Sequence, residues 1–498
     1  MPPSNRLPCS TVGKKTACGE AAKTVMREET MAEKPILIIQ MQRLGDLVLS
    51  YPLMGWLSRL YPKNPLWVVG EEMFFSELME FSPHATYFTY DAAPGLRQQA
   101  FQLVINLSHR PEALDLAGSL NAEERIGAYK ESNAIFINGD WQLYKASLVH
   151  NNRYNLYHWA DINALDVVSP NRIRMTSWPP PRVFGSTASA HVGLFLGASE
   201  RNKHPDAAFW TALASELLQA GHRPVLLGGK AEKALGAEVA RALGSSALNL
   251  TGHFSISALC RFMEKLDIFV TPDTGPMHLA VWTGTPVLNI STGPVNAWET
   301  GPFSPGHYVL RAALPCIGCW HCTQTSVLCK KGLHPGRTAF LIHELVAKNG
   351  AGMSRILLPE QELLRTSRDS HNLFHLEQCT GETPPRQVTA LFWKAFFGNH
   401  FGIFSDAELA LAWKAFAEAS PGNAPAFTRA LVTLSKDLSA HLRGKHNAAV
   451  NTDSFWASFP LPLRPLTSYI QLSLQNGMFN TAAFARALAL VERLIALQ

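Results

Sequence analysis

Two Rossmann-like α/β domains that face each other across a cleft, followed by a C-terminal helical extension, are the fold that the sequence predicts. Short apolar runs alternate with segments of helical spacing over residues 34–182, and the alternation restarts over residues 188–349. A proline-rich break at residues 178–182 separates the two series and is typical of a linker between domains. Over residues 350–498 the spacing is mainly helical, and the 47% apolar content of the chain supplies enough side chains for several cores.

The first 33 residues carry charged side chains without a central apolar stretch, so we expect a disordered tail rather than a secretory signal. No later apolar run is long and unbroken enough to span a bilayer. The net charge of +5 is small for 498 residues and no polybasic run is present, which argues against nucleic acid as a partner. These features together favour a cytoplasmic protein.

The first domain opens with an apolar run at residues 35–39 that is typical of a buried parallel strand. The polar segment that follows ends at Asp46, and residues 47–57 then show helical spacing. Further strand-like runs lie at residues 66–69, 87–90 and 103–107. Because open α/β sheets bind ligands at the carboxyl ends of their strands, Asp46 is a candidate site residue.

The second domain begins with a strand-like run at residues 192–196 and continues through a polar loop that contains Ser199 and Lys203. A glycine-rich turn further along the chain ends at Glu232. The other expected elements are helices at residues 207–220, 231–243 and 257–265 and strands at residues 224–227, 266–270 and 287–290. The loops after the first two strands therefore carry polar and charged side chains at the edge of the sheet where ligands bind.

The strand at residues 266–270 leads into a sharp turn made of Asp273, Thr274 and Gly275, and the residues that follow can form a helix. Such a turn aims unpaired backbone N–H groups and the positive end of a helix dipole at one point, where a phosphate can bind. An ordinary helix cap with a proline just inside the helix has the same sequence. The turn alone leaves both interpretations open.

Several motifs, taken in this order, resemble glycosyltransferase family 9, the ADP-heptose:lipopolysaccharide heptosyltransferases. They are Arg43-Leu-Gly-Asp-Leu-Val-Leu49, Arg125-Ile-Gly127, the loop and helix at residues 197–210, Leu250-Thr-Gly252, and Asp273-Thr-Gly-Pro-Met-His-Leu-Ala280 with Gly284-Thr-Pro286. The similarity covers residues 34–347. It implies the GT-B fold, in agreement with the two α/β domains, and an inverting transfer that needs no divalent metal. The chain contains no Asp-x-Asp pair of the kind that holds such a metal.

The resemblance also implies roles for the candidate residues. Asp46 matches the catalytic base that takes the proton of the acceptor hydroxyl, and capping of the next helix is the alternative. Lys203 and Ser199 match positions that bind the donor diphosphate, although a loop lysine is commonly just solvated. Glu232 matches the carboxylate that binds the nucleoside ribose.

The resemblance likewise implies a ligand, the donor, for the turn after residues 266–270. Thr274 and Gly275 offer a hydroxyl and backbone N–H groups to phosphate oxygens, whereas Asp273 matches the position that contacts the hydroxyls of the donor sugar. His278 lies one helical turn further on and can hydrogen-bond the diphosphate, with a buried core histidine as the alternative.

Half of the eight cysteines cluster in one segment, at Cys316, Cys319, Cys322 and Cys329. Four thiolates at this spacing could hold one structural zinc or iron ion. Some relatives carry a cysteine-rich stretch at this position, and in autotransporter heptosyltransferases such cysteines bind iron. Reduced thiols in a loop below the donor site are the alternative, and we expect that catalysis needs no cofactor.

The function that the resemblance implies is transfer of heptose or a related sugar from an ADP-sugar to a hydroxyl of a cell-envelope glycan or lipopolysaccharide core. The alternatives are a catalytically inactive GT-B-like binding or assembly protein, a heptosyltransferase with a protein acceptor, and a metal or redox protein built on the cysteines. We expect acceptor contacts from His109, Arg110 and Arg125, which can pair with phosphate or carboxylate groups of a lipid-linked acceptor. Peripheral contact with the cytoplasmic face of the inner membrane would suit such an acceptor.

Overall fold

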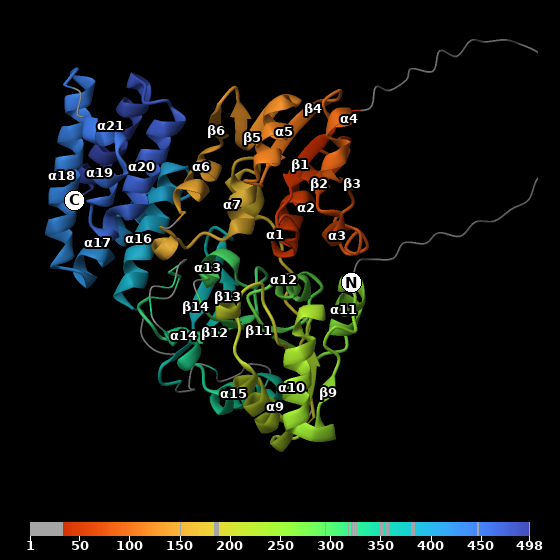
Figure 1. The fold of residues 1–498 in the computed structure, drawn as a ribbon. Helices are drawn as coiled ribbons and strands as arrows, with labels where there is room; N and C mark the ends of the chain where they lie inside the picture. Colours follow the sequence, from red (N-terminus) through yellow and green to blue (C-terminus); the bar gives the residue numbers. More distant parts are fainter. Residues whose placement is uncertain are drawn as a thin grey trace, which may run out of the picture.

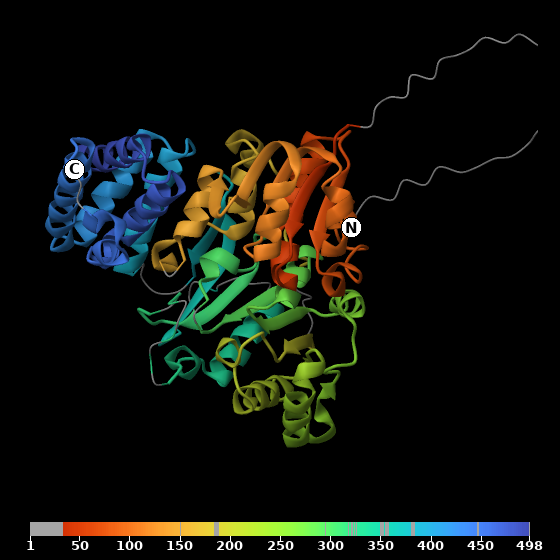
Figure 2. The ribbon, with the colours of Figure 1, turned by 45° about the horizontal axis from the view of Figure 1, so that its top comes forward.

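Two α/β domains and a helical bundle make up the computed structural model of the protein (Figure 1). It describes residues 33–149, 151–183, 189–293, 295–316, 318–319, 322, 324, 326–348, 353, 358–379, 384–445 and 448–497. The expected N-terminal tail at residues 1–33 therefore lies outside the described residues, apart from its last one. The two domains stack with the ends of their sheets toward each other, and the bundle lies beside the first domain in both views (Figures 1 and 2). The expected GT-B arrangement of two Rossmann-like domains with a C-terminal helical extension is confirmed.

The first domain is built on a six-stranded sheet in the order β3-β2-β1-β4-β5-β6, in which only β6 runs antiparallel to its neighbour. All five side chains of β1 are buried, as its apolar run predicts. The strands are β1 (Ile36–Gln40), β2 (Leu66–Gly70), β3 (Thr86–Phe88), β4 (Ala100–Asn106), β5 (Asn121–Glu131) and β6 (Ala134–Asn138). The helices are α1 (Leu44–Leu49), α2 (Tyr51–Leu60), α3 (Glu72–Phe75), α4 (Ala93–Leu96), α5 (Pro111–Ser119), α6 (Asp140–Ser147), α7 (Trp159–Leu165) and α8 (Pro170–Arg174).

The second domain contains an eight-stranded sheet in the order β14-β13-β12-β11-β10-β7-β8-β9. Its strands are β7 (His191–Phe195), β8 (Arg223–Leu227), β9 (Leu248–Asn249), β10 (Ile268–Pro272), β11 (Val287–Ser291), β12 (Tyr308–Ala312), β13 (Gln361–Arg368) and β14 (Phe374–Gln378). Its helices are α9 (Ala207–Gln219), α10 (Lys233–Leu243), α11 (Ile256–Met263), α12 (Gly275–Trp282), α13 (Ala297–Thr300), α14 (Leu328–Lys331) and α15 (Pro335–Lys348).

The last two strands of this sheet, β13 and β14, lie in the range that the sequence assigns to the mainly helical extension. They form an antiparallel hairpin that pairs with β12. Buried and exposed positions are mixed along β13, and the strand contains charged side chains such as Arg365 and Arg368. It therefore lacks the continuous apolar run that marks the parallel strands of the chain.

The helical bundle comprises α16 (Pro385–His400), α17 (Asp406–Ala419), α18 (Asn423–Leu442), α19 (Asp453–Ala457), α20 (Arg464–Asn476) and α21 (Thr481–Ala496). It docks on the edge of the first sheet, where the side chain of Asn476 exchanges two hydrogen bonds of 2.7 and 3.0 Å with the backbone of Ile137 in β6. Phe397 of α16 also packs on Tyr144 of α6, with ring centroids 4.6 Å apart. The bundle thus satisfies an otherwise open sheet edge. Among the described helices, none has both the length and the apolarity to cross a membrane.

Candidate functional site

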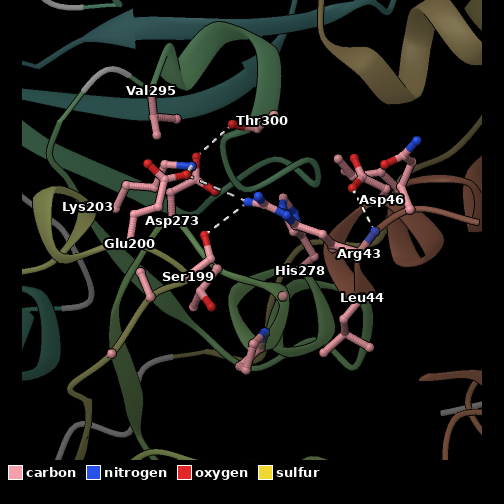
Figure 3. A pocket seen from close by; sticks show the side chains of 18 of the residues that line it. Arg43, Leu44, Asp46, Ser199, Glu200, Lys203, Asp273, His278, Val295 and Thr300 are labelled. Carbon is pink, nitrogen blue, oxygen red and sulfur yellow. Dashed lines mark hydrogen bonds and ion pairs between the residues drawn. The ribbon is translucent and has the colours of Figure 1, made fainter. Parts of the chain in front are cut away.

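A cavity of about 800 Å³ lies between the two α/β domains, at the carboxyl ends of β1, β7, β8 and β10 (Figure 3). The cavity is lined by residues of both domains, among them the candidate residues Asp46, Ser199, Lys203, Glu232, Asp273, Thr274, Gly275, His278 and His109. The structure therefore brings together residues that follow the carboxyl ends of strands in both domains, as the strand-end rule for open α/β sheets leads us to expect.

Asp46 lies in the first turn of α1 and is half-buried at the cavity wall. Its carboxylate accepts a hydrogen bond of 3.2 Å from the backbone N–H of Arg43, so it caps its own helix while it faces the cavity. Burial raises the pKa of Asp46, and the charge of Lys145, the bond from Arg43 and the charge of His109 lower it. Capping and a role as base are thus compatible in one side chain.

Lys145 of α6 is a neighbour of Asp46 that the sequence did not single out. Its ammonium donates a hydrogen bond of 2.9 Å to the side chain of Asn163 and lies 5.1 Å from the ring centroid of Trp159, which lines the cavity. Burial lowers the pKa of Lys145 to about 8, while the charges of Asp46 and Glu299 act to raise it. A lysine in a helix gives no local sequence signal for such a position.

The opposite wall is formed by the loop after β7, which includes Ser199, Glu200 and Lys203. The Lys203 ammonium pairs with the Glu200 carboxylate at 2.9 Å. From the first domain, the Arg43 guanidinium reaches across the cavity and donates to the Ser199 hydroxyl at 3.1 Å, with the Glu200 carboxylate 3.8 Å away (Figure 3). The sequence indicated Ser199 and Lys203 but missed Arg43 and Glu200.

Glu232 is held against the end of β7. Its carboxylate accepts a hydrogen bond of 2.8 Å from the backbone N–H of Gly229. At Gly197 a Cβ atom would stand 2.2 Å from a Glu232 oxygen, so only glycine leaves room for the carboxylate there. The glycines of these loops thereby fix an acidic group at the cavity edge.

The turn between β10 and α12 places Asp273 at the floor of the cavity. The Thr300 hydroxyl donates to the Asp273 carboxylate at 2.6 Å. Burial raises the pKa of Asp273 to about 6, against the lowering effects of Thr300 and Lys203, and the charge of Asp46 raises it further. Asp273 is therefore a carboxylate that stays ionised at neutral pH and takes up a proton in mild acid.

α12 begins directly after Thr274 and is packed against α1. A Cβ atom at Gly275 would lie 2.7 Å from Leu44, so glycine permits the close approach of the two helix starts. His278 is buried beside Gly45, and burial lowers its pKa to about 4. Its ring is therefore neutral at pH 7, and its Nδ1 atom has no hydrogen-bond partner within the described part of the chain.

The three candidate acceptor residues are dispersed. His109 lines the cavity. Arg110 pairs with Glu71 at 2.5 Å and is not among the residues that line the cavity. Arg125 donates to the Leu120 carbonyl at 2.8 Å and lies over the ring of Tyr129. Of this set, only His109 is placed to meet a molecule in the cavity.

The cysteine segment lies below the loop that follows β11. Cys329 is buried in α14, and its Sγ accepts a hydrogen bond of 3.1 Å from the backbone N–H of Gly293. Burial raises the pKa of Cys319, and the nearby thiols Cys322, Cys316 and Cys329 raise it further. The described residues, which exclude 317, 320, 321, 323 and 325 of this segment, contain no group of three His, Cys, Asp or Glu side chains arranged to hold a metal ion.

Solved structures with a similar chain course include the ADP-heptose LPS heptosyltransferase II of E. coli, with a TM-score of 0.47 and 16% identity over 64% of this chain and 100% of that one. Another is the iron-containing dodecameric glycosyltransferase TibC of enterotoxigenic E. coli, with a TM-score of 0.40 and 15% identity over 64% of this chain and 77% of the other.

Among curated proteins, lipooligosaccharide heptosyltransferase 2 of Campylobacter jejuni is 28% identical over 165 residues, which are 31% of this chain and 51% of that protein. Lipopolysaccharide core heptosyltransferase OpsX of Haemophilus influenzae is 19% identical over 278 residues, 52% of this chain and 80% of OpsX. This chain thus spans about half the length of the first of these relatives. The family model of glycosyltransferase family 9 (heptosyltransferase) matches residues 91–328. Over residues 91–328, a little under half of its length, the chain therefore matches glycosyltransferase family 9.

Proposed function

We propose that the protein is an inverting, metal-independent glycosyltransferase that moves heptose or a related sugar from an ADP-sugar to a hydroxyl of a cell-envelope glycan or lipopolysaccharide core. One observation carries the proposal: Asp46 of the first domain and the Lys203 and Asp273 loops of the second line the same cavity. A transfer from a nucleotide sugar needs a base on one side of the sugar carbon and groups that stabilise the departing diphosphate on the other.

In the proposed reaction Asp46 takes the proton of the acceptor hydroxyl as its oxygen attacks the anomeric carbon. The diphosphate leaves from the opposite face toward the Lys203 ammonium, the Ser199 hydroxyl and the start of α12. A single displacement of this kind inverts the anomeric configuration and needs only one carboxylate, whereas glycoside hydrolysis uses a pair.

The other lining residues fit the two ends of an ADP-sugar. In this proposal Glu232, which lines the cavity at the end of β7, accepts hydrogen bonds from ribose hydroxyls. Asp273, which Thr300 orients, accepts hydrogen bonds from the transferred sugar. The neutral ring of His278, with its unpartnered nitrogen within the described chain, can hydrogen-bond the diphosphate without adding charge.

A binding screen followed by one variant tests this function. Nucleotide sugars are first compared by thermal shift with the wild-type protein, and the ligand that binds is then offered with candidate acceptors. We expect Asp46→Asn to lower the transfer rate about a hundredfold to ten-thousandfold, because the amide cannot take a proton, while donor affinity changes little. Asp91→Asn, at an exposed position outside the cavity, serves as the matched control and should transfer at the wild-type rate.

The acceptor arms of the same assay separate the remaining alternatives. The proposal expects transfer to lipid-linked core glycan at a cytoplasmic membrane face, and transfer to a protein hydroxyl instead would identify a protein heptosyltransferase. An Asp46→Asn variant as active as the wild type would refute the proposed base. Wild-type protein that binds no nucleotide sugar would favour the catalytically inactive assembly protein.

The cysteine segment is given no role in this reaction. None of its four thiols is among the residues that line the cavity. The proposed reaction therefore has no step that uses a metal ion at these residues.

A further inference from the structure

Arg43 and Lys203 come from different domains and meet at one carboxylate. The Glu200 carboxylate lies 2.9 Å from the Lys203 ammonium and 3.8 Å from the Arg43 guanidinium. The same guanidinium donates to the Ser199 hydroxyl at 3.1 Å. Figure 3 shows these side chains converging in the middle of the cavity, with Arg43 extended from the first domain toward the loop of the second. One anion thus neutralises two cations at the place where the diphosphate is proposed to bind.

The charge state of this group follows from its surroundings. The hydrogen bond from Lys203 lowers the pKa of Glu200, as do the charges of Lys203 and Arg43, so Glu200 is ionised at neutral pH. The Glu200 and Arg43 side chains are 45% and 66% exposed, and water therefore screens their attraction. Lys203, at 18% exposed, is more enclosed. Because the contact is this exposed, a stronger anion can replace the Glu200 carboxylate without leaving a buried charge unpaired.

We infer that Arg43 is a ligand of the donor diphosphate, and that Glu200 occupies the position of the diphosphate between Arg43 and Lys203 until the donor displaces it. The inference rests on the proposed function and adds to it a cation from the first domain and an internal competitor. A planar guanidinium can bind two phosphate oxygens at once, which an ammonium cannot, so Arg43 supplies geometry that Lys203 lacks.

The position of Arg43 also connects the diphosphate to the base. The backbone N–H of Arg43 holds the Asp46 carboxylate at 3.2 Å, while its side chain reaches the opposite wall of the cavity. A diphosphate that binds the guanidinium therefore fixes the turn that carries the base. The dianionic diphosphate replaces one carboxylate between the same two cations, so the exchange increases the attraction between the domains.

Binding measurements on charge-neutral variants test the inference. The probes are ADP and inorganic pyrophosphate, titrated calorimetrically into the full chain, because they carry the diphosphate without assuming which sugar is transferred. Arg43→Gln should raise the Kd of both probes about tenfold or more through the loss of a charge-assisted, bidentate contact. Glu200→Gln should lower both Kd values about threefold or more, because the competing anion is gone while Arg43 and Lys203 remain.

Arg261→Gln is the matched control for Arg43→Gln. Arg261 also forms an exposed ion pair across the two domains, with Glu80, but it lies outside the cavity. It should change the Kd of ADP by less than about twofold. Thermal unfolding of each variant verifies that the fold is retained, which we expect because none of the substituted side chains is buried.

The outcomes separate the inference from the function on which it rests. If wild-type protein binds ADP and Arg43→Gln binds it equally well, Arg43 is not a ligand and the inference is wrong, while the proposed function stands. If Glu200→Gln weakens binding, Glu200 supports the site rather than competing for it, and the exchange is refuted. If the wild type binds neither probe, the proposed function fails and the inference fails with it.

Discussion

The two α/β domains touch where α1 packs on α12 and also on two sides of the cavity, and the two side contacts differ in burial. The first, which we call the buried joint, sets residues 152–161 against α13 and the β13–β14 hairpin. Asn152 and Asn155 donate to the Glu299 carboxylate at 2.8 and 2.9 Å, and all three side chains are at most 3% exposed. In the same joint the buried ring of His158 lies 3.0 Å from the Gly301 carbonyl.

The second, which we call the exposed contact, sets the residues after α3 against α11 and α12. The backbone N–H of Ser257 donates to Glu77 at 3.2 Å, and the Trp282 indole donates to the Phe81 carbonyl at 2.7 Å. Arg261 and Glu80 form an ion pair with side chains 61% and 57% exposed. Water can replace each of these partners, whereas the groups of the buried joint would be left unsatisfied if they separated.

The difference indicates where the domains can move. Separation at the buried joint would take several buried polar groups away from their hydrogen-bond partners. We therefore expect that joint to stay closed and to act as the pivot. Opening at the exposed contact breaks these hydrogen bonds and the ion pair, together with the ring contact of the buried Tyr51 with Trp282, whose centroids are 5.3 Å apart. It would widen the cavity on the side where Arg43 meets Glu200. A donor would then enter from the exposed side, and its diphosphate would draw the domains together.

The largest effect is expected from breaking the buried joint at Asp161. This carboxylate is 1% exposed, pairs with Arg368 at 3.4 Å and accepts a hydrogen bond of 2.8 Å from the backbone N–H of Phe374. Asp161→Ala removes the carboxylate paired with the buried Arg368 guanidinium, which lies over the rings of Trp178 and Phe303, and leaves only the charge of Asp369 acting on it among the described carboxylates. We expect a loss of about 3–5 kcal/mol in the free energy of unfolding.

Urea denaturation of the Asp161→Ala variant measures this loss. Asp161→Asn is the matched control, because its side-chain oxygen can still accept the bond from Phe374, and it should lose less. An alanine variant that unfolds at the wild-type urea concentration would show that the buried joint contributes little to stability.

A smaller loss is expected where α1 and α12 meet at the floor of the cavity. Gly275→Ala would place a methyl group 2.7 Å from the side chain of Leu44, so the helix starts must move apart. Overpacking of this kind costs about 1–3 kcal/mol and would also shift Asp46 relative to the second domain. Gly55→Ala is the control: this position in α2 has no atom within 4 Å of the added methyl group. There the thermal midpoint should stay or rise, because alanine favours a helix.

Lys145 acts on both Glu299 of the buried joint and Asp46, the proposed base, and its removal should alter the pH profile more than stability. Its charge lowers the pKa of Asp46, and the charges of Asp46 and Glu299 in turn raise the pKa of Lys145. The charges of Arg43 and His109 also lower the pKa of Asp46, and the charge of Asp46 raises the pKa of Asp273. A base works only when ionised, so activity falls as the pH drops through its pKa. Without Lys145 that pKa rises, and the acidic limb of kcat/KM in Lys145→Met should move to higher pH.

Lys145→Arg keeps the positive charge and should leave the limb close to its wild-type position. A limb that stays in place in Lys145→Met, or that moves to lower pH, would mean that the ammonium does not act on the base.

Much of the fold could be predicted from the sequence, because the parallel strands are continuous apolar runs such as β1 and β10, all of whose side chains are buried. The β5–β6 and β13–β14 hairpins gave no such signal. β5 contains Glu123 and Glu124 at exposed positions and Arg125 at a half-buried one, and only Ile126 and Gly127 are buried. An edge or antiparallel strand with one solvated face does not need an apolar run, so its composition resembles that of a loop.

The residues of the candidate site likewise divide into those that the sequence indicated and those that it did not. Asp46 lies in the segment after β1 and Asp273 directly follows β10, so the strand-end rule indicated both before the structure placed them in one cavity. Arg43, Glu200 and Lys145 could not be found in this way, because each acts through a partner that is far away in the sequence. Which charge faces them depends on how the two domains pack, and local spacing does not contain that information.

The smallest effect is expected from Arg261→Gln at the exposed contact. The ion pair with Glu80 is surrounded by solvent, so its loss should change the free energy of unfolding by less than about 1 kcal/mol. The difference in free energy of unfolding between the wild type and Arg261→Gln should shrink as salt is added. Salt screens the attraction between Arg261 and Glu80, which only the wild type has. Urea denaturation at low and high ionic strength, run beside Asp161→Ala, measures both contacts on one scale. A loss at Arg261 as large as that at Asp161 would mean that the two sides hold the domains equally, and the buried joint could then no longer be regarded as the pivot.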